Sequence, residues 1–305
     1  MKIKTLLFGA GAGAITFIHN TQAQREFIGF IDNDKAKHGK QLAGLHIYPP
    51  SSIENFDFDE IVISTQWALD VQRQLLDNCQ IPPEKVLLPQ KNLFKKIQPF
   101  ANLASLQLGR TIIGELSELA VIRKLPLVVD FGTLLGLTRD GDIIPWDDDI
   151  DFSAPVEYAK NVELLLSEFV RTNKQLANWK VEKVVNKINQ KVGFLLTFDD
   201  QLNRLSQFTT SLCLRQNNNG MSEHMPSLGM WSAPSIHFEQ VDMMQWQGKQ
   251  IQVPHQHREY LSYQYGDWIT PKKDIQLSDY DNLQQVEFAD IQAAGFTAQE
   301  LLGTE

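Results

Sequence analysis

The feature that most constrains the fold is the acidic run within residues 145–152, Pro-Trp-Asp-Asp-Asp-Ile-Asp-Phe. The proline and the alternating apolar residues predict a strand here. Side chains two positions apart in a strand share a face, so the pattern predicts Asp147, Asp149 and Asp151 together, with Asp148 on the opposite face. Carboxylates in such a row repel one another. The row is therefore expected to be solvated, protonated or bridged by a cation.

Oxygen-only ligands favour Mg²⁺, Mn²⁺ or Ca²⁺ over zinc. Asp147, Asp149 and Asp151 also fit the first, third and fifth positions of an EF-hand calcium loop. However, the sixth position is Phe152 instead of glycine, and the twelfth is Tyr158 instead of glutamate. The sequence thus predicts a catalytic Mg²⁺ or Mn²⁺ site, and a solvated acidic loop is the alternative.

A phosphate-binding turn is predicted shortly before the acidic run. Residues 127–129 read as a buried strand, and Gly132 and Thr133 directly precede a helical segment at 134–138. Backbone N–H groups at a helix N-terminus, together with a hydroxyl, can hold a phosphate. A phosphate cradle beside a row of carboxylates suits phosphoryl transfer, in which metal ions neutralise the phosphate oxygens.

The stretch from Gly132 to Asp151 resembles the signature of the LicD-type phosphocholine transferases and the fukutin-related ribitol-phosphate transferases. It reads GTLLGLTRDGDIIPWDDDID and matches the pattern G-[TS]-L-L-G followed by I-P-W-D-x-D-x-D. The resemblance implies an α+β nucleotidyltransferase fold of the DNA polymerase β type, in which Asp149 and Asp151 are the catalytic pair. The implied metal ligands are Asp147, Asp149 and Asp151, and the implied phosphate-binding residues are Gly132, Thr133 and Arg139.

By the same resemblance, a third carboxylate is expected on a later strand. Residues 236–244 alternate weakly and predict that strand, and Val241-Asp242-Met243 resembles the family's second acidic motif. Asp242 is therefore expected to be catalytic and to bind metal, with Glu239 as the fallback and a capping role for Asp242 as the alternative. The segment 253–271 looks like the family's closing motif, in which Tyr260 is expected to be mainly a core residue.

The chain departs from the family pattern in three places. The glycine that commonly precedes the Gly-Thr pair is Phe131 here, which narrows the freedom of the turn. Cys213 is the single cysteine of the second half, so no Cys/His zinc finger is expected. The polar region Asp199–Gly229 resembles nothing in the family. It could be a mobile flap that selects the acceptor or a plain loop, and the sequence supports both hypotheses equally.

The first 93 residues predict an α/β module of the Rossmann type, with short apolar strands between helical segments. Gly9 and Gly11 follow the first strand, and Asp32 ends the second, 32 − 11 = 21 positions after Gly11. That is where a carboxylate meets a ribose hydroxyl in a dinucleotide fold. Glycines there let the backbone approach a phosphate. Tight packing of strand against helix with nothing bound is the alternative.

Residues 27–34, with Gly39-Lys40 and Gly44, resemble the small Rossmann-like domain attached to many bacterial surface-polysaccharide enzymes. This resemblance implies a setting in glycan assembly, such as lipopolysaccharide or capsule modification, and no particular reaction. The module lacks the YxxxK pair of short-chain dehydrogenases, which argues against an oxidoreductase.

Composition excludes several other classes. With 28 basic and 37 acidic residues, the net charge is −9. The sequence contains no long basic run, so nucleic acid is not indicated as a partner. Two cysteines are too few for a disulfide scaffold. Lys2, Lys4 and the apolar stretch 6–18 could mimic a signal peptide, but glycines interrupt it. No run suffices to span a membrane, so a cytoplasmic location is expected, with peripheral membrane contact allowed.

Together these patterns predict two domains, a Rossmann-like domain at 1–93 and a nucleotidyltransferase-like domain at 94–305. The resemblance implies transfer of a phospho-alcohol group from a CDP-activated donor to a sugar hydroxyl of a cell-surface or lipid-linked glycan. The alternative is a non-catalytic protein that senses a nucleotide sugar through the first domain, and an NAD-dependent enzyme is a third hypothesis. The alcohol, the acceptor, the ligand of the first domain and the oligomeric state stay open.

Overall fold

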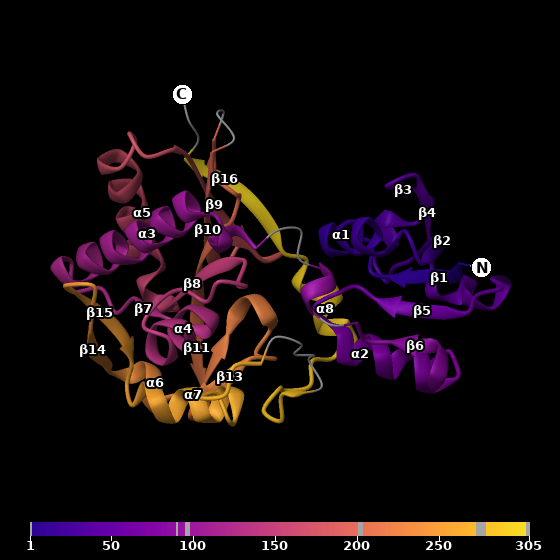
Figure 1. The fold of residues 1–305 in the computed structure, drawn as a ribbon. Helices are drawn as coiled ribbons and strands as arrows, with labels where there is room; N and C mark the ends of the chain where they lie inside the picture. Colours follow the sequence, from indigo (N-terminus) through magenta and orange to yellow (C-terminus); the bar gives the residue numbers. More distant parts are fainter. Residues whose placement is uncertain (1, 90, 95–97, 201–203, 273–278, 303–305) are drawn as a thin grey trace. The chain divides into compact units, whose positions relative to one another are not determined.

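The computed structural model describes residues 2–89, 91–94, 98–200, 204–272 and 279–302 (Figure 1). The chain divides into two compact units, Met1–Lys96 with Lys272–Asp281, and Ile97–Pro271 with Asn282–Glu305. Each unit combines β-sheet with helices, so the α/β character predicted from the sequence is confirmed. Among the described residues, no helix has the length and apolarity needed to cross a membrane.

The first unit is built on a six-stranded sheet in the order β3-β4-β2-β1-β5-β6. All neighbours pair in parallel except β3 and β4, which form an antiparallel hairpin. The sequence did not predict this hairpin. Its turn residues, Ala43 and Gly44, both have positive φ, as a two-residue type I′ turn requires. The elements are β1 (Ile3–Phe8), α1 (Ala12–Thr21), β2 (Arg25–Ile31), β3 (Gln41–Leu42), β4 (Leu45–Tyr48), β5 (Glu60–Ile63), α2 (Ala68–Arg73) and β6 (Val86–Leu87).

The second half of β1 is buried on both faces, which explains its apolar run Leu6-Leu7-Phe8. Leu7 packs with Phe17 and Phe30 on one side of the sheet. Leu6 and Phe8 pack with a second apolar cluster on the other side. The sheet of this unit is therefore covered on both faces, as expected of a parallel sheet.

The second unit contains an eight-stranded sheet whose main path is β13-β12-β11-β10-β9-β16. Strand β8 pairs in parallel with β11, and β7 pairs antiparallel with β8. A separate antiparallel hairpin is formed by β14 and β15. The strands are β7 (Val128–Val129), β8 (Asp149–Pro155), β9 (Asn178–Val185), β10 (Lys191–Asp199), β11 (Thr209–Asn218), β12 (Met221–His224), β13 (Ser232–Pro234), β14 (Val241–Trp246), β15 (Lys249–Pro254) and β16 (Thr297–Leu302).

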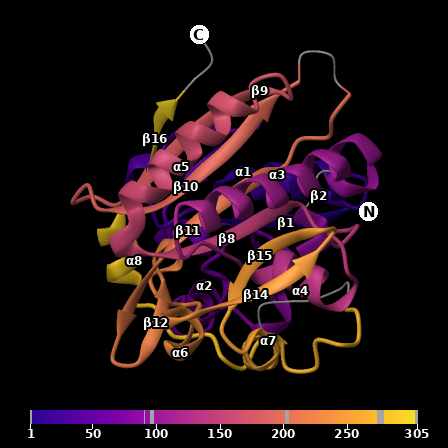
Figure 2. The same ribbon diagram turned by 90° about the vertical axis from the view of Figure 1, so that its left-hand side faces the viewer.

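The longest helix of the second unit, α3, begins where Asn102 accepts hydrogen bonds from two backbone N–H groups of the first turn. Apolar residues recur along α3 with a period close to that of a helix, and Leu108, Ile112 and Leu116 of this row are buried, whereas Ile122 at its end is exposed. Helix α5 packs against α3 and also contacts β8 and β10 (Figure 2). The helices are α3 (Leu103–Ile122), α4 (Phe131–Arg139), α5 (Ala159–Thr172), α6 (Ile236–Glu239), α7 (His257–Tyr265) and α8 (Phe288–Ala294).

Two expectations for this unit are wrong. The region Asp199–Gly229, expected to be a flap or a loop, holds all of β11 and β12, although its residues 201–203 lie outside the described part of the chain. Residues 236–239 form the short helix α6, so the strand predicted over 236–244 begins only at Val241. The apolar alternation of residues 236–239 is too short and too weak to distinguish a single helical turn from the start of a strand.

Candidate functional site

The turn between β7 and α4 lies at the centre of the predicted site. Asp130 caps α4 by accepting the Phe131 N–H at 2.8 Å. A Cβ built at Gly132 would overlap Oδ2 of Asp147. The absence of a side chain at Gly132 therefore lets the acidic run approach the first turn of α4, as predicted for a turn beside a carboxylate row.

Three carboxylates converge beside this turn. One oxygen each from Asp147, Asp148 and Asp149 lies within 4.8 Å of the others. The predicted orientation of Asp148, away from the row, is wrong. Strand β8 begins only at Asp149, so the strict alternation of a strand does not govern the two residues before it.

Asp151 lies one strand period after Asp149 and is tied to the same turn. Its backbone N–H donates to the hydroxyl of Thr133 at 2.9 Å. Burial, together with the charges of Asp149 and Asp147, raises the pKa of Asp151 well above its ordinary value. Asp151 is thus close enough to feel the other carboxylates, and a nearby cation would relieve their mutual repulsion.

This donor set fits a hard divalent cation. Ligand oxygens about 2.1 Å from one octahedral Mg²⁺ lie about 3.0 to 4.2 Å apart. The separations among Asp147, Asp148 and Asp149, none above 4.8 Å, come close to that range. All the donors are carboxylate oxygens, which Mg²⁺ and Mn²⁺ prefer and which suit zinc less.

Behind the turn lies a buried ionic network that the sequence did not reveal. Arg215 on β11 donates to Oδ2 of Asp130 at 2.8 Å, and the Tyr260 hydroxyl donates to Oδ1 at 2.5 Å. Ser153 on β8 donates to Oδ2 at 2.5 Å. Asp130 is 0% exposed and Arg215 2%. Burial alone would raise the pKa of Asp130, but the charge of Arg215 and these hydrogen bonds lower it.

Phe131 has a backbone φ of 45°, a conformation rare for a bulky residue. Its ring makes edge contacts with His224 and Trp231, with centroids 5.3 and 5.9 Å away. The Arg215 guanidinium lies 5.3 Å from the same centroid. Burial, followed by the charge of Arg215, lowers the pKa of His224 to about 3, so the ring beside Phe131 is neutral at pH 7.

The remaining residues predicted for this site are bonded within the chain. Arg139 pairs with its neighbour Asp140 at 2.7 Å. Asp242 lies on β14, where its two oxygens contact His255 Nδ1 at 3.0 Å and accept the Gln256 N–H at 2.9 Å. These bonds do not link Arg139 or Asp242 directly to Asp147, Asp148 and Asp149. The fallback residue Glu239 ends α6, and its carboxylate accepts the Ser235 hydroxyl at 2.6 Å.

In the first unit, the glycine turn and Asp32 come together as predicted. Oδ2 of Asp32 accepts the Ala10 N–H at 2.8 Å and pairs with Lys37 at 2.9 Å. A Cβ at Gly9 would lie 3.1 to 3.2 Å from Ser64 and Thr65, so this glycine permits close packing of the chain on itself. A Cβ at Gly11 would meet nothing within 4 Å. Gly11 thus faces open space, whereas Gly9 is packed against the chain just after β5.

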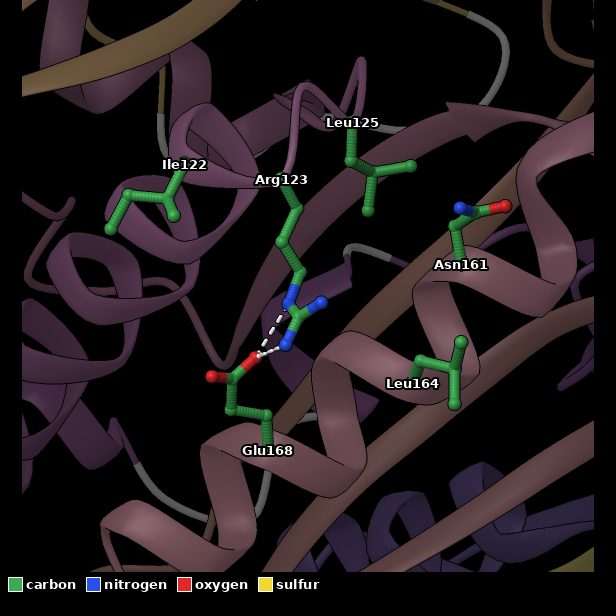
Figure 3. A pocket seen from close by; sticks show the side chains of 6 residues that line it. All are labelled: Ile122, Arg123, Leu125, Asn161, Leu164 and Glu168. Atoms are coloured by element: carbon green, nitrogen blue, oxygen red, sulfur yellow. Dashed lines mark hydrogen bonds and ion pairs between the residues drawn. The ribbon is translucent and has the colours of Figure 1, made fainter.

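A hollow of about 330 Å³ lies elsewhere in the second unit, between the C-terminal end of α3 and helix α5 (Figure 3). The Arg123–Glu168 ion pair crosses it, and Ile122 and Leu164 line it. Leu125, also in its lining, precedes β7, whereas the acidic site follows β7. The hollow thus contains none of the predicted site residues.

Each part of the chain matches the model of a known family. Residues 124–256 match the LicD/FKTN/FKRP nucleotidyltransferase domain, a stretch that includes the acidic run, Arg215 and Asp242. This match confirms the resemblance to the LicD-type family noted in the sequence. Residues 1–87 match the C2185-like N-terminal domain. No curated protein matches the chain.

Solved structures give weak likenesses. UDP-D-quinovosamine 4-dehydrogenase from Vibrio fischeri is 23% identical over 28% of this chain and 75% of its own, with a TM-score of 0.23. The Rex-family repressor RSP is 14% identical over 25% of this chain and 40% of its own, with a TM-score of 0.22. The antibiotic-resistance factor ANT(2'')-Ia is 16% identical over 56% of this chain and 80% of its own, with a TM-score of 0.32. Scores this low do not establish a common fold.

Proposed function

We propose that this chain is a metal-dependent phosphotransferase that moves a phospho-alcohol group from a CDP-activated donor to a sugar hydroxyl of a cell-surface or lipid-linked glycan. The carrying observation is the convergence of Asp147, Asp148 and Asp149 beside the N-terminus of α4, inside a LicD-type domain. We further propose a polymerase β-type fold for the second unit, a Rossmann-like fold for the first and action in the cytoplasm.

In the proposed reaction, the acceptor hydroxyl attacks the phosphorus distal to cytidine. The bond from that phosphorus to the bridging oxygen breaks, and CMP leaves with that oxygen. Asp147, Asp149 and Asp151 are the proposed ligands of Mg²⁺ or Mn²⁺, and the neighbouring Asp148 is added to them because of its position. A bound metal ion would neutralise the diphosphate oxygens during in-line displacement.

The chain itself would orient the donor and receive the proton. Backbone N–H groups at the start of α4, around Gly132, point to where a phosphate would lie in this proposal. Thr133 supports this turn through the bond from the Asp151 N–H, and Arg139 is the proposed cationic partner of the diphosphate. Asp242, held by His255, is the candidate that accepts the proton of the attacking hydroxyl.

Calorimetric titration of CDP, UDP, ADP and NAD, each with and without Mg²⁺, tests the proposal in the wild-type chain and in Asp149→Ala. We expect metal-dependent binding of CDP alone, lost in the variant because one proposed ligand is gone. Lys37→Ala, in the first unit and remote in sequence from the carboxylates, is the control and should bind CDP as wild type does.

Binding of UDP or NAD that survives Asp149→Ala would contradict the proposal. It would move the nucleotide site to the first unit, where Gly9, Gly11 and Asp32 are the proposed contacts, and favour the sensor or the oxidoreductase. With CDP binding established, assays with CDP-linked choline, ethanolamine, glycerol and ribitol would identify the alcohol.

A further inference from the structure

The turn that carries Gly132 is held in a conformation that its sequence disfavours. Phe131, with φ of 45°, stands where an L side chain is strained and where glycine would be at ease. Strain of this kind persists when surrounding contacts impose it, and it is concentrated at functional sites. The question is therefore which contacts impose it here.

Three side chains from other elements, those of Arg215, Tyr260 and Ser153, converge on Asp130, the residue before the strained position. Asp130 accepts the Phe131 N–H, Arg215 donates to Asp130 from β11, and Tyr260 donates to it from α7. Arg215 also donates to the backbone carbonyl of Ser222 at 3.2 Å. Asp130 is thus fixed by two strands and a helix, and it fixes the backbone that follows it.

The same turn determines where two proposed metal ligands lie. The missing side chain at Gly132 leaves room for the carboxylate of Asp147, and Thr133 accepts the backbone N–H of Asp151. A change in the path of residues 131–133 would therefore move Asp147 and Asp151 relative to one another.

We propose that Arg215, Asp130 and Tyr260 form a positioning unit that holds the Phe131–Gly132 turn and thereby sets the spacing of the carboxylate cluster. The effect of this unit on metal binding rests on the function proposed above, whereas its hold on the turn does not. A buried ion pair is a weak source of stability, because desolvation offsets much of its attraction. The position of this ion pair, directly behind the turn, suits a role in fixing the backbone path of that turn.

Tyr260→Phe is the sharpest test, because it removes one hydroxyl and leaves the ring packed against Phe238. Tyr263→Phe, on the same helix, is the matched control, since Tyr263 packs at the edge of the core. Two quantities are measured in the full chain: the Mn²⁺ dissociation constant, and amide hydrogen exchange in a peptide spanning residues 128–136. Circular dichroism and Tm follow the fold in both variants.

For Tyr260→Phe we expect exchange in this peptide about tenfold faster and Mn²⁺ binding about tenfold weaker, the loss typical when a partner behind a metal ligand is removed. Tyr263→Phe should change neither. Wild-type exchange in Tyr260→Phe, or equal changes in both variants, would overturn the positioning role. If the wild-type chain binds no Mn²⁺, the proposed function is wrong. The exchange data then still show whether Tyr260 helps to hold the Phe131–Gly132 turn.

Discussion

At Gly132 the α-carbon faces the carboxylate of Asp147, and there is no room for a methyl group between them. We predict that Gly132→Ala displaces Asp147, weakens Mn²⁺ binding at least about tenfold and costs about 1–3 kcal/mol of unfolding free energy through overpacking. Mn²⁺ titration and thermal denaturation measure the two effects.

Gly11→Ala provides the control, because its Cβ would enter open space and its φ of −134° suits any residue. It should leave both quantities unchanged. A Gly132→Ala chain that binds Mn²⁺ like the wild type would mean that Asp147 contributes no ligand atom.

At the scale of single residues, the sequence predicted where the acidic cluster lies but not which of its carboxylates converge. Asp148 joins because β8 starts two residues later than the alternation suggested. Asp130 and Arg215 went unnoticed although each interrupts an apolar stretch, Val128-Val129 and Leu212-Cys213-Leu214. A charge in such a setting signals a buried ion pair, but one chain gives no means of pairing residues 85 positions apart.

Among the elements, the β14–β15 hairpin carries the residue whose role is most open. Both oxygens of Asp242 are engaged, by His255 and by the N–H of Gln256 just before α7. Asp242→Asn distinguishes a structural clamp from a chemical role, because the amide keeps the shape and loses the charge.

If Asp242 acts in the reaction as proposed, Asp242→Asn should lower kcat at least about a hundredfold, within the range for general acid–base groups, and leave Tm nearly unchanged. Steady-state kinetics and melting curves decide this. Lower Tm with wild-type kcat would assign Asp242 to the fold. Gln250→Ala, on the partner strand and exposed, controls for damage to the hairpin.

Helices and strands were predictable where the hydrophobic pattern extends over many residues, and they were missed where an element is only a few residues long. The stripe of α3 and the buried strand β1 were predictable because their apolar residues repeat or run without interruption. The hairpin β3–β4 and the helix α6 span two to four residues per element, too few for any period to show. Strands β11 and β12 were missed because polar residues at 216–220 masked a pairing that the whole sheet stabilises.

For the whole molecule, the raised pKa of Asp151 predicts how metal and pH act together. As pH rises through that raised pKa, the metal-free second unit gains a repelling negative charge and loses stability, whereas metal binding requires the ionised carboxylate. Saturating Mg²⁺ should therefore raise the Tm of the second unit by about 5 °C or more at pH 8, and by less at pH 5.

Differential scanning calorimetry at the two pH values measures this, and Asp151→Asn should reduce the pH dependence. The first unit has its own apolar clusters and holds none of these carboxylates, so its transition should stay in place. Equal shifts of Tm at pH 5 and pH 8 would show that protons and metal do not compete for Asp151.

The pairing of β16 with β9 has a consequence during synthesis on the ribosome. All six strands of the first sheet lie before residue 88, so that sheet can assemble early as the chain emerges. In the second sheet, β9 keeps one edge unpaired until Thr297–Leu302 are translated. Exposed strand edges template association with other chains. A nascent chain stalled between residues 200 and 290 is therefore where we expect chaperones to be needed most.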